Sequence, residues 1–320
     1  MRFNVDAWDP GYGTSVEDDA ARTKSSARVE LDVERDAADW KPVEPSPVRA
    51  PSAVLFVDGV RRIDAQLWVN NGADDASAST ASLAICASYA AGVVCCTASG
   101  ATVPTVRVRR GLFTAAEEAR TVATSAGAYT LHKVRRDDAD ALSQGVQNQL
   151  ADVEVEVARV AREGLGSAAT GADLLVVDGP LRGRQHLPRA IGFIKTHRAE
   201  YLPAQLNGVV ARLDPAHRSP VFRMGTSWDR YAWYLRLPGG AGAPWAGVVR
   251  VECAAELAAA DAVALANLSQ ETLCRYASVE FKDSRAPQNL VPIGGLERTL
   301  RRRLGDPGLL YRALRAAARA

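Results

Sequence analysis

The sequence of 320 residues lacks several features that would place it in a familiar class of protein. No two of its five cysteines have the CxxC spacing of zinc ribbons, and their odd number does not suggest a disulfide framework. No run approaches the roughly 18 consecutive apolar residues that a membrane-spanning helix needs. No phosphate-binding loop of the GxxxxGK[ST] type occurs. Any ATP-driven step must therefore come from another protein.

The sequence also lacks a large excess of positive or negative charge, because the formal net charge is only +2. No global field therefore indicates nucleic acid, and a basic surface for phosphates must be local. The N-terminus lacks the apolar core of a secretory signal, and all five cysteines lie in apolar or helical surroundings. Buried thiols fit a reducing compartment. We expect a cytoplasmic protein that does not enter a membrane.

The most informative feature present is a repeated pattern of four apolar residues followed by Asp-Gly. It occurs at Val54–Gly59 and again at Leu174–Gly179. A short apolar run of this kind is typical of a strand buried on both faces, and the glycine permits a sharp turn after it. If the two strands are neighbours, Asp58 and Asp178 lie side by side and form a binding site for a divalent metal ion. The alternative is that each Asp-Gly pair merely starts a turn.

The remaining pattern predicts an α/β domain preceded by a polar arm. Residues 1–50 are polar and end in a proline-rich stretch, so we expect an N-terminal arm or linker there and a domain over residues 51–320. A hairpin around Gly59 is expected to pair strands at 53–58 and 63–69, with a loop at 70–80. Apolar residues recur at helical spacing from Asp137 to Glu163. Further strands and closing helices make a mixed sheet flanked by helices.

The order of these elements resembles the NurA nuclease family, which has a ribonuclease H-like fold. The resemblance covers roughly residues 53 to 305. It is carried by a set of short segments that occur in the family's order: Asp58-Gly with Arg61, the long helix bearing acidic residues, Asp178-Gly-Pro-Leu181, Ile191–Lys195, Tyr234-Leu-Arg236, Val249–Glu252 and Arg285–Leu290.

The resemblance implies a manganese- or magnesium-dependent DNA nuclease that forms a homodimer and works with a hexameric HerA-type ATPase in DNA end processing and repair. Carried over, Asp58 and Asp178 are metal ligands, and a helix glutamate completes the cluster. Glu154 is preferred because it shares a helix face with Leu150 and Val157, and Glu156 is the alternative. Glu297 stands where the family places a late acidic residue or histidine.

Basic residues near these acids are candidates for contacts with DNA. Lys195 ends a strand and could neutralise charge at the scissile phosphate, which makes it a catalytic candidate beside Asp58, Asp178 and Glu154. The DNA-binding candidates are Arg61, Arg62, Arg182 and Arg236. Arginine suits this role because its guanidinium group binds phosphate in a bidentate manner. A solvated surface position is the alternative for each.

Two rival functions remain open. Asp-Gly after an apolar strand also occurs in phosphotransferases that form an aspartyl phosphate, but Val60 and Pro180 stand where that chemistry needs a second acid. The other rival is a catalytically degenerate nuclease-fold subunit that clamps DNA or regulates a motor ATPase. Metal-dependent cleavage separates a nuclease from such a clamp.

Overall fold

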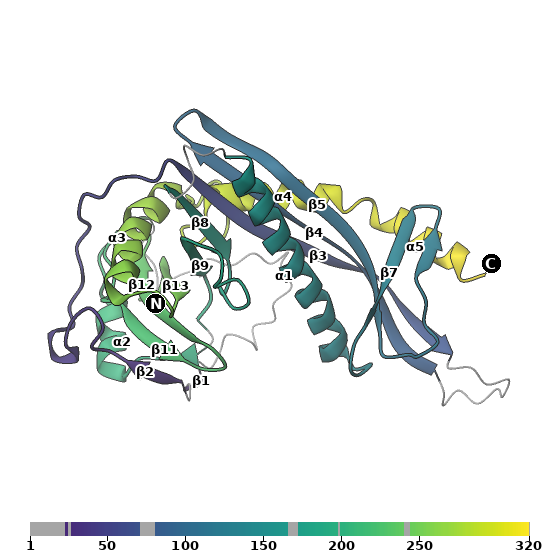
Figure 1. The fold of residues 1–320 in the computed structure, drawn as a ribbon, viewed down its shortest axis with the longest axis horizontal. Coiled ribbons are helices and arrows are strands. Elements are labelled where there is room, and N and C mark those ends of the chain that lie inside the picture. Colours follow the sequence, from purple (N-terminus) through teal and green to yellow (C-terminus); the bar gives the residue numbers. More distant parts are fainter. Residues whose placement is uncertain are drawn as a thin grey trace, which may run out of the picture. The chain divides into compact units, whose positions relative to one another are not determined.

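The computed structural model describes residues 23–24, 27–70, 81–165, 172–197, 199–239 and 244–319. The chain divides into two compact units (Figure 1). Unit 1 comprises Met1–Phe56, Cys96–Gly100 and Ser167–Gly294, and unit 2 comprises Val57–Cys95, Ala101–Gly166 and Gly295–Ala320. The expected loop at 70–80 and the first 22 residues of the expected arm lie almost wholly outside the described residues.

Unit 1 is built on a mixed sheet. Its strands neighbour one another in the order β2 (Arg28–Glu30), β11 (Phe222–Gly225), β12 (Asp229–Arg236), β13 (Val248–Ala254), β9 (Ala190–Ile194) and β8 (Asp173–Asp178), followed by β3 (Ala53–Asn70). The pairs from β2 to β9 are antiparallel, whereas β8 and β9 are parallel. A separate parallel pair joins β1 (Thr23–Lys24) to β10 (Ala199–Glu200).

Helices cover both faces of this sheet. Successive side chains of a strand point to opposite faces, so neighbouring residues of β12 show what packs on each. Trp233 of β12 donates a hydrogen bond to Ser269 of helix α3 (Ala259–Tyr276). The next residue, Tyr234, packs instead in an apolar cluster with Trp40 and with Val210 of helix α2 (Ala204–Ala211). The mixed α/β sheet flanked by helices is thus confirmed for this unit.

Part of the expected N-terminal arm is clamped onto unit 1. Arg218, whose side chain is 1% exposed, forms a two-pronged ion pair with Glu34, with both N–O distances 2.8 Å. The Val221 amide donates to the same carboxylate at 2.7 Å. A short 3-10 helix, η3 (Ala37–Asp39), leads to the buried Trp40, and β2 lies before the clamp. Residues 28–40 therefore contribute to the core of this unit.

We predict that this clamp is sensitive to acid. Although burial acts to raise the pKa of Glu34, its hydrogen bonds and charge interaction with Arg218 outweigh burial and hold that pKa below its usual range. A lowered carboxyl pKa contributes stability above the unfolded value and loses it as the pH falls. Glu34→Gln should lower the free energy of unfolding by about 2 kcal/mol at neutral pH. Urea unfolding from about pH 5 to about pH 3 should then show a shallower loss of stability in the variant than in the wild type. Parallel curves would contradict the clamp.

Unit 2 contains a second stretch of mixed sheet with three helices. The strand order is β3, β4 (Ala81–Thr97), β5 (Gly100–Thr114), β7 (Gly127–Lys133) and β6 (Val122–Thr124). The pair β5–β7 is parallel and the pair β6–β7 is antiparallel. The helices are α1 (Ala139–Glu163), α4 (Val291–Arg303) and α5 (Pro307–Ala317).

Helices α1 and α5 lie on opposite faces of this sheet. Phe113 of β5 points toward α1, because a Cβ atom built on Gly145 of α1 would lie 3.1 Å from its ring. Its neighbour Leu112 packs in an apolar cluster with Leu314 of α5. Figure 1 shows α1 crossing the strands of this unit and α4 and α5 following one another along them.

The expected hairpin around Gly59 is wrong, because β3 runs without a turn from Ala53 to Asn70. Gly59 does not form a turn; it lies where helix α1 packs against β3. A Cβ atom at this position would lie 2.6 Å from Oε1 of Glu154 and 2.7 Å from Cδ1 of Leu150, both on α1. The glycine therefore lets the helix approach the strand closely. The helix predicted over Asp137–Glu163 is confirmed with an N-terminal boundary two residues later.

The cysteines agree with a further expectation, that they are small buried side chains. Four of the five cysteines are buried, Cys274 is half-buried, and all are free thiols. Burial raises the pKa of Cys274 to about 12, and burial together with the charge of Glu252 raises that of Cys253 to about 12. These thiols are small core side chains. Within the described ranges, no helix is both long enough and apolar enough to cross a membrane.

Candidate metal centre

Asp58 is held in the interior by the continuous strand β3. Its residue is 7% exposed, and its Oδ1 accepts a hydrogen bond from the Gly59 amide at 2.7 Å. The apolar run before it, from Ala53 to Val57, is buried throughout. A carboxylate at the end of such a run has few rotamers to choose from, so its position is well fixed.

Glu154 and Asp58 are brought into the same neighbourhood by the close contact of α1 with β3. Glu154 is 5% exposed, and its Oε1 faces the backbone of Gly59, the residue that follows Asp58. The alternative helix acid, Glu156, lies elsewhere. It is partly exposed and forms ion pairs with Arg107, at 3.3 Å, and with Arg109 of β5. Of the two helix acids, Glu154 is thus the one that lies near Asp58.

Glu297 is the third buried carboxylate of unit 2. It lies on α4 and is 6% exposed. One carboxylate oxygen of Glu297 and one of Asp58 lie within 4.8 Å of each other. Helix α4 packs against β4, since a Cβ atom at Gly92 would meet Leu296 at 3.1 Å and Leu300 at 3.2 Å. The predicted late acidic residue is thus placed beside the first Asp-Gly aspartate.

Asp178 ends strand β8 in unit 1, and the chain turns a few residues later, at 182–186. Gly179 has a φ of +100°, a conformation that favours glycine. Lys195, one residue past β9, forms an ion pair with Asp178 at 2.7 Å between Nζ and Oδ2. Its Nζ also donates to Oδ1 of Asn289 at 3.1 Å. Lys195, which was expected to end a strand near the acids, thus lies directly beside the second aspartate.

Lys195 is held in place by a short polar network of Asn289, Asp283 and Arg285. The fully buried Asn289 donates from Nδ2 to Asp283 at 2.6 Å, and Asp283 is paired with Arg285 at 3.2 Å. Burial acts to raise the pKa of Asp283, but the hydrogen bonds from Asn289 and Arg285 outweigh it and lower that pKa. An ionised Asp283 orients the Asn289 amide so that its oxygen faces the lysine. The network fixes the ammonium group beside Asp178.

Glu252 anchors the turn that follows Asp178. It is fully buried on β13, accepts a hydrogen bond from the Leu181 amide at 2.7 Å, and pairs with Arg230 at 3.0 Å. Arg250 lies 3.8 Å away. Burial raises the pKa of Glu252, and the two arginines and the Leu181 amide oppose that shift. Gly192 makes room for this arrangement, because a Cβ atom there would lie 2.9 Å from Glu252 and from the Leu181 nitrogen.

Within unit 2, the buried carboxylates of Asp58 and Glu297 form a group of oxygen donors that could contribute to a site for a divalent metal ion. Asp178, the third predicted acid, is half-buried at the end of β8 in unit 1. Carboxylate oxygens are the ligands preferred by Mg²⁺ and Mn²⁺. The absence of cysteine and histidine from this group makes it unlike a typical zinc site. The donor chemistry therefore fits the predicted cofactor class.

The four arginines proposed to bind DNA have different surroundings. Arg182 is exposed in the turn region after β8. Arg61 is exposed but donates to the backbone oxygen and hydroxyl of Ser143 on α1 at 3.1 and 3.0 Å. Arg62 pairs with Asp64 at 2.9 Å and donates to the Gly305 carbonyl at 2.8 Å. Arg236 donates to the carbonyl oxygens of Ala211, Pro244 and Ala246. Arg62 and Arg236 thus hold backbone segments in place.

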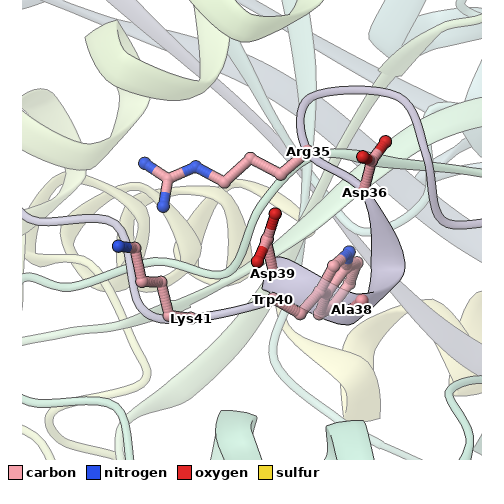
Figure 2. Close-up of a pocket in the computed structure, with 6 residues that line it drawn as sticks. All are labelled: Arg35, Asp36, Ala38, Asp39, Trp40 and Lys41. Carbon is pink, nitrogen blue, oxygen red and sulfur yellow. The ribbon is translucent and has the colours of Figure 1, made fainter.

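Two surface hollows of about 650 Å³ each lie apart from the candidate acids in the chain. One is bordered by residues 35–41, and Figure 2 shows the Arg35 and Lys41 side chains extending from it with the Asp39 carboxylate between them. The other lies between β7 and the start of α1, where Lys133 and Arg135 border it. Neither is lined by a residue of the predicted cluster.

Comparison with known proteins finds similarity among solved structures. No protein-family model and no curated protein matches the sequence. Among solved structures, the crystal structure of the NurA nuclease from Sulfolobus solfataricus is similar, with a TM-score of 0.45 and 10% sequence identity. The alignment covers 83% of this chain and 84% of that chain. It is a structure of the family that the residue pattern resembles.

Proposed function

We propose that this protein is a divalent-metal-dependent deoxyribonuclease that hydrolyses phosphodiester bonds as an exonuclease, an endonuclease or both. The observation that carries the proposal is the pair of buried carboxylates Asp58 and Glu297 in unit 2, which has the donor chemistry of a magnesium or manganese site. When bound, such an ion activates water and stabilises charge on the phosphate and on the leaving oxygen. The residue pattern shared with the NurA family supports DNA as the substrate.

The side chains divide this work between holding the ion and preparing its surroundings. We assign Asp58, Asp178, Glu154 and Glu297 as metal ligands. The ion pair of Lys195 with Oδ2 of Asp178 leaves Oδ1 of that carboxylate as a possible ligand atom. Lys195 also places a fixed positive charge at the end of β9, where it can balance negative charge that develops on a phosphate. We therefore assign Lys195 a catalytic role.

The proposal also covers the residues that contact DNA, the oligomeric state and the partner protein. Arg61, Arg62, Arg182 and Arg236 are proposed to contact DNA, and the exposed Arg182 is the best placed of them. We further propose a homodimer in the cytoplasm that processes DNA ends with a HerA-type hexameric ATPase. The support for a separate motor is that the sequence contains no GxxxxGK[ST] loop of its own.

The test of this function compares two glutamates on the same helix. Labelled single- and double-stranded DNA is incubated with Mn²⁺, Mg²⁺ or EDTA. We expect metal-dependent cleavage that EDTA abolishes. Glu154→Gln should lower the rate by about 10²-fold, because it removes a buried carboxylate beside Asp58. Glu156→Gln, the matched control, should cleave at the wild-type rate because this acid is paired with surface arginines.

Two outcomes would count against the proposal. Cleavage that persists in EDTA would remove the metal from the mechanism. Equal loss in both variants would show that the effect comes from the helix as a whole. If no cleavage occurs with any metal, the test is repeated with the HerA-type ATPase. Continued absence of cleavage would then favour the DNA clamp.

A further inference from the structure

The C-terminal helices of unit 2 carry a concentration of arginine that the proposed metal centre does not use. The last 30 residues contain seven arginines and no lysine, against two acids, Glu297 and Asp306. The whole chain has 39 basic and 37 acidic residues, so the other 290 residues carry 32 and 35 and are net negative. The positive charge of this protein is therefore concentrated on α4 and α5 and the residues that follow them.

These arginines point away from the core. All seven are exposed, and together we call them the arginine face: Arg298, Arg301, Arg302, Arg303, Arg312, Arg315 and Arg319. Apart from Arg301, none of them forms an ion pair with another residue in the described part of the chain. Of the two acids, Glu297 is buried and Asp306 accepts a hydrogen bond from the Leu309 amide at 2.6 Å. The charge of the other six arginines is consequently directed toward solvent and, among the described residues, is not balanced by an ion pair.

The two helices are rigidly mounted, which distinguishes them from a loose basic tail. Leu300, Leu304, Leu310 and Leu314 are all at most 3% exposed. Two arginines of the sheet cap the end of α4, because Arg62 donates to the Gly305 carbonyl at 2.8 Å and Arg110 to the Leu304 carbonyl at 3.3 Å. A rigid array of cations loses little conformational entropy when it binds a charged polymer.

The spacing of the arginine face suits the phosphates of one nucleic-acid strand. Arg312 and Arg315 are three residues apart on α5 and form a stripe on one face, and Arg319 follows just after the end of the helix. The 11 residues of α5 span about 17 Å, the length of about five phosphates along a strand. Tyr311 is 47% exposed beside this stripe. An exposed aromatic ring among cations is a stacking platform for unpaired bases.

We propose that the arginine face binds a single DNA strand along its phosphates and guides it on unit 2. The inference rests on the proposed function for the identity of the polymer, and it adds a binding surface on the helices that follow the buried Glu297. Because α4 carries the buried Glu297 and, on another face, the exposed Arg298 and Arg302, the same helix holds a proposed metal ligand and the start of the strand path. This surface should set affinity and salt dependence without taking part in hydrolysis.

The test measures binding without cleavage. The affinity of the full-length protein for a labelled single-stranded oligonucleotide is followed by fluorescence anisotropy in EDTA, between about 50 and about 200 mM salt. The triple variant Arg312→Ala, Arg315→Ala, Arg319→Ala should bind at least about tenfold more weakly. The slope of log affinity against log salt concentration, which is negative, should become about two less steep. Lysine at the same three positions should restore most of that slope, because it keeps the charge.

Matched controls separate this surface from general charge and from the metal centre. Replacing Arg49, Arg120 and Arg212, which are also exposed, by alanine removes the same charge elsewhere and should leave affinity and slope near the wild-type values. Hydrolysis of the small phosphodiester bis(p-nitrophenyl) phosphate should be unchanged in the alanine variant of α5. If the wild type hydrolyses neither this ester nor DNA, the proposed function fails while the binding test still stands.

Two results would overturn the inference. One is an unchanged affinity and salt slope in the α5 variant, which would leave an acidic protein surface as the partner of these helices. The other is equal weakening in the α5 variant and in the control variant, which would show that only net charge matters. Circular dichroism on each variant checks that the helices are intact.

Discussion

Asp58→Asn is expected to lower metal-dependent DNA cleavage by about 10³-fold, equivalent to about 4 kcal/mol of transition-state stabilisation. The substitution keeps the shape of the side chain and leaves an oxygen that can accept the hydrogen bond from the Gly59 amide. It removes the charge that a hard cation requires from its ligand. Because Asp58 is buried on a rigid strand, no other described side chain of that strand is positioned to replace it. Initial rates on labelled DNA with Mn²⁺ and Mg²⁺ measure the effect.

Asp178→Asn should lower metal-dependent cleavage by a similar factor. It removes a proposed ligand and also the negative charge that pairs with Lys195. Asp229→Asn is the matched control, since Asp229 is an exposed strand aspartate paired with Arg223 at 3.4 Å. Wild-type rates in both Asp58→Asn and Asp178→Asn would show that these carboxylates do not serve the reaction.

Glu252→Gln is expected to cause the largest loss of stability of any single substitution considered for unit 1, about 3–5 kcal/mol in the free energy of unfolding. The reason is that Glu252 is fully buried between two buried arginines, Arg230 and Arg250, which would keep their charges without a counterion. Glutamine can still accept the hydrogen bond from the Leu181 amide, so the variant isolates the charge. Urea unfolding of the two proteins at neutral pH measures the difference.

The control for this effect is an exposed ion pair of the same type. Glu30→Gln removes a glutamate whose partner Arg28 lies 3.5 Å away with a side chain 72% exposed. Surface pairs contribute little, so we expect a change within about 0.5 kcal/mol. Equal stability of Glu252→Gln and wild type would mean that Glu252 does not neutralise the two arginines. Reduced activity in a variant that stays folded would support its role in holding the turn after Asp178.

Much of the fold follows from local patterns. The apolar runs before Asp58 and Asp178 predicted buried strands, and the helical spacing from Leu142 to Ala161 predicted α1. These predictions succeeded because burial imposes a short-range periodicity on the sequence. The prediction of a hairpin at Gly59 was wrong, because the residue type alone does not distinguish a glycine within a strand from a glycine in a turn. Only the position of α1 reveals that this glycine accommodates Leu150 and Glu154.

The features that sequence reasoning missed depend on contacts between distant residues. Glu34 and Arg218 are 184 residues apart, and no local pattern indicates that they meet. Glu252 and Asn289 were quoted as part of the family resemblance but were not assigned a role. A signal for Glu252 does exist: it is a charged residue within the apolar strand Val248–Ala254, where a buried charge requires partners. Strand β11, only four residues long, offered too short a pattern to recognise.

The most direct test of the central claim is the binding of Mn²⁺ to the protein in the absence of DNA, followed by electron paramagnetic resonance. The wild type should bind the ion saturably, and Asp58→Asn and Glu297→Gln should each bind it at least about tenfold more weakly, because each removes one carboxylate of the proposed site. Glu156→Gln should bind it as the wild type does. Equal binding by all four proteins would contradict a metal centre that uses Asp58 and Glu297.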